Sequence, residues 1–194
     1  MRSPESLEPR EQNLNESAES REQRVLEKAQ EIARIIDSDL GVQLGDRTVV
    51  PDDKSKGEYQ KICLVFLHST IEGLEWSQEF ETDQDYLDNK LEEVIRRIYE
   101  RELSEVKQRR VLERAKEIAH KIDPDLEVKL KRVITTPDDR SKTEYEATDL
   151  WFFHATRRNL TWSQEFKTDQ AYIDNELEGA IRRAYEYKNA KSNN

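Results

Sequence analysis

The chain has 194 residues, of which 38% are charged and 35% hydrophobic, and its formal net charge is −10. This length gives room for two small domains, each with a thin hydrophobic core. The acidic balance disfavours generic binding to nucleic acid or to anionic membranes, because such a surface repels phosphate groups.

The sequence has no pattern typical of secretion or of membrane insertion. Cys63 is the single cysteine, so no disulfide can form within the chain. The longest apolar run, Ile62 to Leu67, is far shorter than the roughly 20 residues of a membrane-spanning helix. The start of the chain lacks the hydrophobic segment of a secretory signal. We therefore expect a cytoplasmic protein that does not contact membranes.

An internal repeat with an offset of 86 residues is the strongest pattern in the sequence. Residues 24–101 align with residues 110–187 without a gap, and roughly 44 of about 78 positions are identical. The first copy is strongly acidic, whereas the second is nearly balanced. We interpret the pattern as a tandem duplication of one module, so each position has a counterpart for comparison.

The repeat divides the chain into five segments. Residues 1–20 are rich in Ser, Glu and Asn and poor in apolar groups, which predicts a disordered acidic tail. The first repeat is predicted over residues 21–101, a helical joint over 102–109 and the second repeat over 110–187. Residues 188–194 are predicted to form a flexible tail.

Each copy begins with a predicted helix and continues with predicted strands. Apolar residues recur at helical spacing over residues 25–36, and Asp37-Ser38-Asp39 ends this helix. Alternating apolar residues predict a first strand at 40–44, a second at roughly 59–69 and a third at about 74–81. The equivalent positions in the second copy give the same prediction.

A second helix is predicted to open at Thr82-Asp83, where Asp83 can cap the first turn. Each copy is therefore an α-β-β-β-α module of the α+β class, with a three-stranded antiparallel sheet and two helices on one face. The sequence from Thr82 to Asp123 contains neither Gly nor Pro. We expect one continuous helix of about 40 residues to join the copies and fix their relative orientation. The alternative is a tight turn near Leu103-Ser104.

The second strand is apolar on both faces, which is typical of a central strand. If the helices cover one face, the other face presents Val65 and Leu67 in the first copy and Trp151 and Phe153 in the second. An apolar strip with a charged rim is typical of a protein interface. The second helix of each copy also has a Tyr and an Arg at equivalent positions, and we add these four residues to the candidate contacts. The candidate partner-binding residues are Trp151, Phe153, Val65, Leu67, Tyr86, Arg97, Tyr172 and Arg183.

His68 and His154 are the only histidines that recur in the repeat. Each lies on the face of the second strand whose residues are identical in the two copies. We expect each to be a core histidine with a hydrogen bond, and the alternative is a general base or a pH switch. The sequence has no Cys-x-x-Cys and no His-x-x-x-His. We therefore expect neither a metal nor a cofactor.

The element order α-β-β-β-α resembles that of the double-stranded-RNA-binding domain, which grips phosphates with lysines at the start of its second helix. Here that helix opens with Asp83-Gln84-Asp85, so the resemblance covers element order only and family membership is not assigned. Cations are more frequent in the second copy. Its candidate nucleic-acid contacts are Lys129, Lys131, Arg132, Arg140, Lys142, Arg157 and Arg158.

Doubled recognition surfaces without a catalytic pattern favour a non-enzymatic adaptor or regulator that binds another protein. Duplex-RNA binding through the second copy is one alternative. A small-ligand or enzymatic site around His68 or His154 is another. Self-association as a homodimer is compatible with all three functions, because exposed sheet faces and edge strands invite it.

Overall fold

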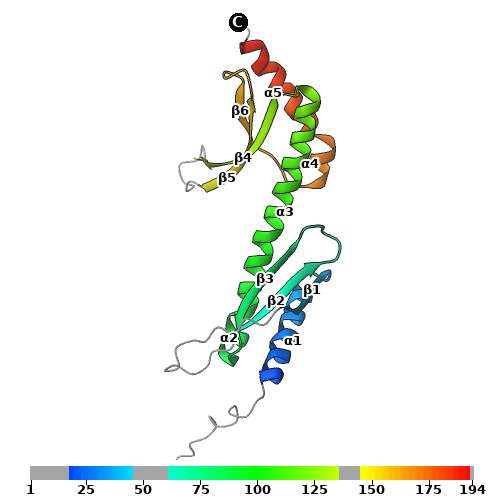
Figure 1. Ribbon diagram of the computed structural model, residues 1–194, viewed down its shortest axis with the longest axis vertical. Helices are drawn as coiled ribbons and strands as arrows, with labels where there is room; N and C mark the ends of the chain where they lie inside the picture. The colour runs from blue at the N-terminus through cyan, green and yellow to red at the C-terminus, as the bar shows by residue number, and fades with distance from the viewer. Residues whose placement is uncertain (1–17, 46–60, 136–144, 193–194) are drawn as a thin grey trace, which may run out of the picture. The chain divides into compact units, whose positions relative to one another are not determined.

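The computed structural model describes residues 18–45, 61–135 and 145–192, and Figure 1 shows the arrangement of their helices and strands. The chain divides into two compact units, Met1–Leu103 and Ser104–Asn194. Both are α+β, and each contains a three-stranded antiparallel sheet. The predicted fold class is confirmed at this level.

The first unit begins with helix α1, Ala18–Ile36, followed by strands β1, Leu40–Leu44, β2, Lys61–His68, and β3, Glu75–Glu81. The strands follow one another in the sheet in the order β1-β2-β3. A short helix α2, Gln84–Asn89, then leads to the long helix α3, Leu91–Ile122. The central position predicted for the second strand is therefore confirmed.

The second unit has the same order of strands and helices. Its strands are β4, Leu126–Thr135, β5, Tyr145–His154, and β6, Thr161–Gln164, in the sheet order β4-β5-β6. Helices α4, Gln170–Asn175, and α5, Leu177–Ser192, follow. Figure 1 shows α5, α4 and the later part of α3 gathered on one side of this sheet.

Alternate residues of the strands supply the sheet side of each core. In β5, Leu150 and Phe152 have no exposed surface, and the ring of Phe152 stacks on Trp162 of β6 at 4.6 Å between centroids. In β2 the equivalent residue, Phe66, stacks on Trp76 at 4.7 Å. Since successive side chains of a strand point to opposite faces, the residues between these buried ones lie on the face away from the core.

Helix α3 contributes to both cores. Leu91 and Ile95 near its start are fully buried, and so are Val111 and Ala115 further along. Its 32 residues form one helix through the predicted joint, so the alternative of a turn near Leu103 is wrong. Its length would suffice to cross a bilayer, but among the described residues no helix is apolar enough to do so.

The second helix of each module differs from the prediction because it is interrupted once. Lys90 separates α2 from α3 with φ −124°, and Glu176 separates α4 from α5. Asp83 caps α2 as predicted, since its side chain accepts a hydrogen bond from the backbone N–H of Tyr86. Neither interruption has a Gly or Pro, so the sequence pattern gave no sign of it.

The predicted flexible tail at 188–194 is wrong for its first residues, because α5 continues to Ser192. Asn189 lies in this extension and accepts a hydrogen bond of 2.8 Å from the Arg157 guanidinium. This contact ties the last turns of α5 to the segment that follows β5. At the other end of the chain, α1 begins at Ala18, inside the predicted acidic tail.

Candidate functional site

Two aromatic side chains of β5 lie on the face of the second sheet away from the core. Trp151 and Phe153 are partly exposed, whereas their neighbours Leu150 and Phe152 are completely buried. The two outward rings stack on each other, with centroids 4.8 Å apart and planes at 29°. The predicted outward direction of Trp151 and Phe153 is thus confirmed, and the two rings form one apolar surface.

Lysines from the neighbouring strand β4 cover parts of these rings. Lys129 Nζ lies 4.8 Å from the centroid of Phe153, and Lys131 Nζ lies 5.6 Å from that of Trp151. Lys129 pairs with Trp151 in the sheet, so each lysine reaches diagonally to a ring. Both distances are within the range of cation–π attraction. The rings are therefore bordered by positive charge on the β4 side.

Asp149 completes this face and is unusual in its burial. It precedes Trp151 on the same side of β5 and is only 8% exposed, although it carries a carboxylate. Its Oδ1 atom is buried without a hydrogen-bond partner among the described residues. A buried acceptor without a donor is costly for the folded protein. We refer to Lys129, Lys131, Asp149, Trp151 and Phe153 as the aromatic face.

The equivalent face of the first sheet is aliphatic. Val65 and Leu67 occupy the positions of Trp151 and Phe153, and Leu67 is 38% exposed. Glutamates border them on β3, where Glu75 pairs with Leu67 and Glu79 with Cys63. Cys63 is a free, half-buried thiol. The two faces therefore differ in both ring content and the sign of the neighbouring charge.

The tyrosine and arginine candidates on the helices are placed less uniformly than expected. Arg97 and Arg183 are exposed, and Tyr86 is half-buried. Burial raises the pKa of the Tyr86 phenol, and the nearby Arg97 acts in the opposite direction. Tyr172, by contrast, is only 7% exposed and belongs to the core of the second unit. Tyr172, a candidate partner contact in the sequence, therefore lies in the core and not on the surface.

A polar cluster of Asp37, His68 and Tyr99 lies where α1 ends and β2 ends. Asp37 Oδ2 accepts a hydrogen bond of 2.6 Å from the Tyr99 hydroxyl and lies 3.2 Å from His68 Nε2. Its other oxygen, Oδ1, accepts from the backbone N–H of Asp39. The His68 side chain is 2% exposed. The prediction of a hydrogen-bonded core histidine is confirmed for this residue.

The contacts of the His68 ring fix its tautomer. Backbone N–H groups of Thr70 and Ile71 point at Nδ1 from 3.2 and 3.0 Å, so Nδ1 acts as an acceptor. Nε2 then carries the proton and donates it to the Asp37 carboxylate. Neither nitrogen is free to take a proton from a substrate in this arrangement.

The second unit repeats the cluster with Asp123, His154 and Tyr185. Asp123 Oδ2 lies 3.1 Å from His154 Nε2 and accepts a 2.7 Å hydrogen bond from the Tyr185 hydroxyl. The backbone N–H of Arg157 donates to His154 Nδ1, as Ile71 does to His68. The Arg157 side chain adds a further bond, because Nη2 lies 2.7 Å from the same Asp123 oxygen.

These contacts shift the pKa values of the groups involved. The hydrogen bond from Tyr99, more than any other contact, lowers the pKa of Asp37 to about 2. Burial, followed by the bond to Asp37, raises the pKa of Tyr99 to about 12. In the second unit the Tyr185 hydroxyl lowers the pKa of Asp123 in the same way. Both aspartates are therefore anions over the whole neutral range.

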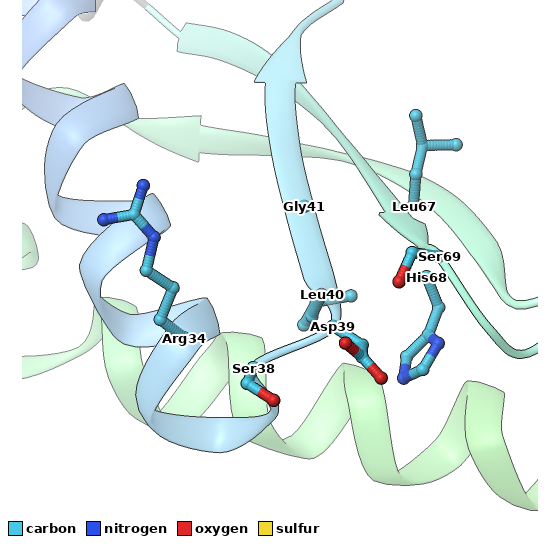
Figure 2. Close-up of a pocket in the computed structure, with 8 residues that line it drawn as sticks. All are labelled: Arg34, Ser38, Asp39, Leu40, Gly41, Leu67, His68 and Ser69. Atoms are coloured by element: carbon cyan, nitrogen blue, oxygen red, sulfur yellow. The ribbon is translucent and has the colours of Figure 1, made fainter.

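Each unit also has three side chains of the types that bind metal ions, with one ligand atom each and all three atoms within 4.8 Å of one another. These are Asp37, Asp39 and His68 in the first unit and Asp123, Asp125 and His154 in the second. Figure 2 shows the Asp39 carboxylate directed toward the His68 ring at the edge of a pocket that also touches Arg34 of α1. A metal ion at His68 would have to displace the proton shared with Asp37, because Nδ1 is already occupied. The geometry is that of a structural hydrogen-bond cluster.

Sequence reasoning missed the partners of the two histidines. The sequence pattern identifies Asp37 and Asp123 only as residues that end a helix, and it does not distinguish Tyr99 and Tyr185 from other tyrosines. All six residues recur at the common offset, which is the one signal that could have found them. Which of these residues are hydrogen-bond partners is visible only in the folded structure, because Asp37 and Tyr99 are 62 positions apart in the sequence.

The candidate nucleic-acid contacts are dispersed. Lys129 and Lys131 lie on the aromatic face, Arg132 and Arg158 are exposed elsewhere, and Arg157 is bonded within the Asp123 cluster. Arg140 and Lys142 lie outside the described residues. The part of the chain that the structure describes therefore brings only two of these cations together on one surface.

Comparisons with other proteins add no relative. No protein-family model, no curated protein and no solved structure matches this chain.

Proposed function

We propose that this protein is a non-enzymatic protein-interaction module that binds its partner through the aromatic face of the second unit. One observation carries the proposal: two stacked aromatic rings, Trp151 and Phe153, lie partly exposed on the side of β5 away from the core. Trp is among the residues that contribute most to binding energy at protein interfaces. Rings already stacked lose little conformational freedom when a partner covers them.

The border of the aromatic face supports the same function. Lys129 and Lys131 border the rings with positive charge on the β4 side. An apolar centre with a polar rim is the usual anatomy of an interface. A partner surface with acidic groups beside an apolar centre would match these features.

The repeat supports different binding roles for the two units. We take the internal repeat as a tandem duplication in which the second copy has the aromatic rings Trp151 and Phe153 where the first copy has Val65 and Leu67. The two units then present related surfaces of different chemistry, as expected of an adaptor or regulator that works inside the cell.

The enzymatic alternative has less support, because His68 and His154 use both ring nitrogens for internal hydrogen bonds. The nucleic-acid alternative has less support because Arg157 is bonded to Asp123. Arg132 and Arg158 are exposed, but they do not lie on the aromatic face with Lys129 and Lys131.

A comparative pull-down tests the proposal. Wild-type protein, Trp151→Asp and the matched Val65→Asp should be used as baits in extract from the native host. We expect proteins that wild-type protein and Val65→Asp retain and that Trp151→Asp loses, because aspartate places a charge in the centre of the aromatic face. Equal thermal stability of the baits would show that Trp151→Asp is folded. Identical sets of retained proteins for all three baits would refute the proposal.

A further inference from the structure

The free edge of β4 lies beside a groove of about 460 Å³. Helix α3 lines one side with Leu112, Lys116 and His120, and residues 126–130 of β4 line the other. β4 pairs with β5 on one side only, so its second edge is open within the sheet. The groove therefore exposes a row of backbone groups as well as side chains.

The pairing pattern shows which backbone groups these are. The N–H of Ala155 donates to the carbonyl of Asp125 at 2.9 Å, which places odd-numbered residues of β4 in the hydrogen-bonded pairs with β5. The N–H and C=O of even-numbered residues then point to the free edge. Among described residues, none bonds to the edge groups of Val128 and Leu130. An extended chain could pair with both.

In the first unit a side chain occupies one backbone acceptor of the equivalent edge. Gln30 of α1 donates a hydrogen bond of 3.1 Å from Nε2 to the carbonyl of Val42 in β1. Lys116 and Val128 occupy the same positions of the repeat in the second unit. Lys116 turns instead to Glu113, with Nζ 2.8 Å from Oε1. The edge of β4 thus lacks the contact that Gln30 makes to the carbonyl of Val42 at the edge of β1.

We propose that β4 takes up an acidic peptide as an added strand, with its backbone paired to Val128 and Leu130. Strand addition is a common mode of peptide recognition, in which main-chain hydrogen bonds supply affinity and alternate side chains supply specificity. β4 carries Lys129, Lys131 and Arg132 but only one acidic residue in its described part, Glu127. These charges favour glutamates or aspartates on the peptide.

A second copy of this chain fits the edge less well. Pairing of two β4 edges would bring lysines of both copies together, and like charges across paired strands are destabilising. Lysines on an edge strand are a usual means of preventing such self-pairing. The edge also differs from the aromatic face, since it offers backbone groups of β4 rather than the outward rings of β5.

The test uses the full-length protein and a fluorescent synthetic peptide of alternating glutamate and valine. We expect anisotropy titrations to show binding, and hydrogen exchange to show protection at Val128 and Leu130. Lys116→Gln should weaken binding by about three- to tenfold, because the glutamine would compete for the carbonyl of Val128. Lys116→Met removes the charge without supplying a donor, so its loss should be smaller. Trp151→Ala removes the larger ring of the aromatic face without adding a charge, so it should bind the peptide like wild type, which separates this proposal from the function of the aromatic face.

Several results would overturn the proposal. These are no binding of the peptide, equal binding of a lysine–valine peptide, equal affinity of Lys116→Gln and Lys116→Met, and protection confined to strands other than β4. Sedimentation that shows dimers broken by the peptide would identify β4 as a self-association edge and would overturn it as well.

Discussion

At the scale of single residues, the Asp–His–Tyr clusters show how a partly buried charge is held. Asp37 receives three hydrogen bonds, from Tyr99, His68 and the backbone of Asp39. Charge-assisted hydrogen bonds are roughly twice as strong as neutral ones, so the cluster can join the end of α1 to β2 and α3. Its residues are most simply explained by this structural role.

The two clusters predict a difference between equivalent tyrosines. Tyr99→Phe should lower the free energy of unfolding by about 1 to 2 kcal/mol, since it removes a hydrogen bond to a carboxylate. Tyr185→Phe should cost less, because Asp123 keeps the bond from Arg157. Urea unfolding of both variants at neutral pH measures the two costs. Equal costs would show that Arg157 does not compensate.

The low pKa of Asp37 predicts a dependence of stability on pH. Its pKa falls from an ordinary 3.8 to about 2 in the folded protein. The stabilisation, of order 1 to 2 kcal/mol, is therefore fully present above about pH 4 and is lost as the pH falls toward 2. The stability gap between wild type and Asp37→Asn should narrow over this range in urea titrations. A gap independent of pH would contradict the assignment.

The His68 ring predicts a spectroscopic signature. Two backbone N–H groups point at Nδ1, so the ring should be the neutral tautomer with its proton on Nε2. Long-range ¹H–¹⁵N NMR spectra at neutral pH distinguish the two tautomers directly. His154 should give the same pattern, whereas the exposed His120 serves as the control. A proton on Nδ1 of His68 would exclude the cluster as described.

At the scale of elements, the outward side of β5 has the clearest consequence. Trp76 and Trp162 are 9% and 7% exposed, whereas Trp151 lies partly open on the aromatic face. Acrylamide should therefore quench mainly Trp151 in the wild-type protein. Trp151→Phe should remove most of the quenchable fluorescence and leave the melting temperature nearly unchanged. Trp162→Phe should do the reverse, because that ring stacks in the core.

The sequence predicted the elements well where local patterns decide them. Alternation located β1 and β3, and the absence of Gly and Pro predicted the continuous α3. The breaks at Lys90 and Glu176 have no local signal, so they depend on packing between elements. The partners of His68 and the open edge at Val128 likewise depend on residues that are distant in sequence. The aromatic face was predictable because period-two alternation places Trp151 opposite Phe152.

At the scale of the whole molecule, α3 makes the stability of one unit depend on a helix that also serves the other. Ser104→Pro should break this helix, since proline removes a backbone hydrogen bond and clashes with the preceding turn, at a cost of ~3 kcal/mol. Ser104 is exposed, so the substitution disturbs no core contact. We expect lower helix content and a broader or split thermal transition in circular dichroism. Ser104→Ala is the control and should melt like wild type.

The shared helix also bears on how the protein is made. Helix nucleation is costly, whereas extending an existing helix adds one hydrogen bond for each residue fixed. The chain leaves the ribosome from its N-terminus, so the first unit can assemble around Leu91 and Ile95 before β4 has emerged. The part of α3 that belongs to the second unit then forms by extension of a helix that the first unit has already nucleated. The strands of the second unit can therefore pack against a helix that is already formed when they emerge.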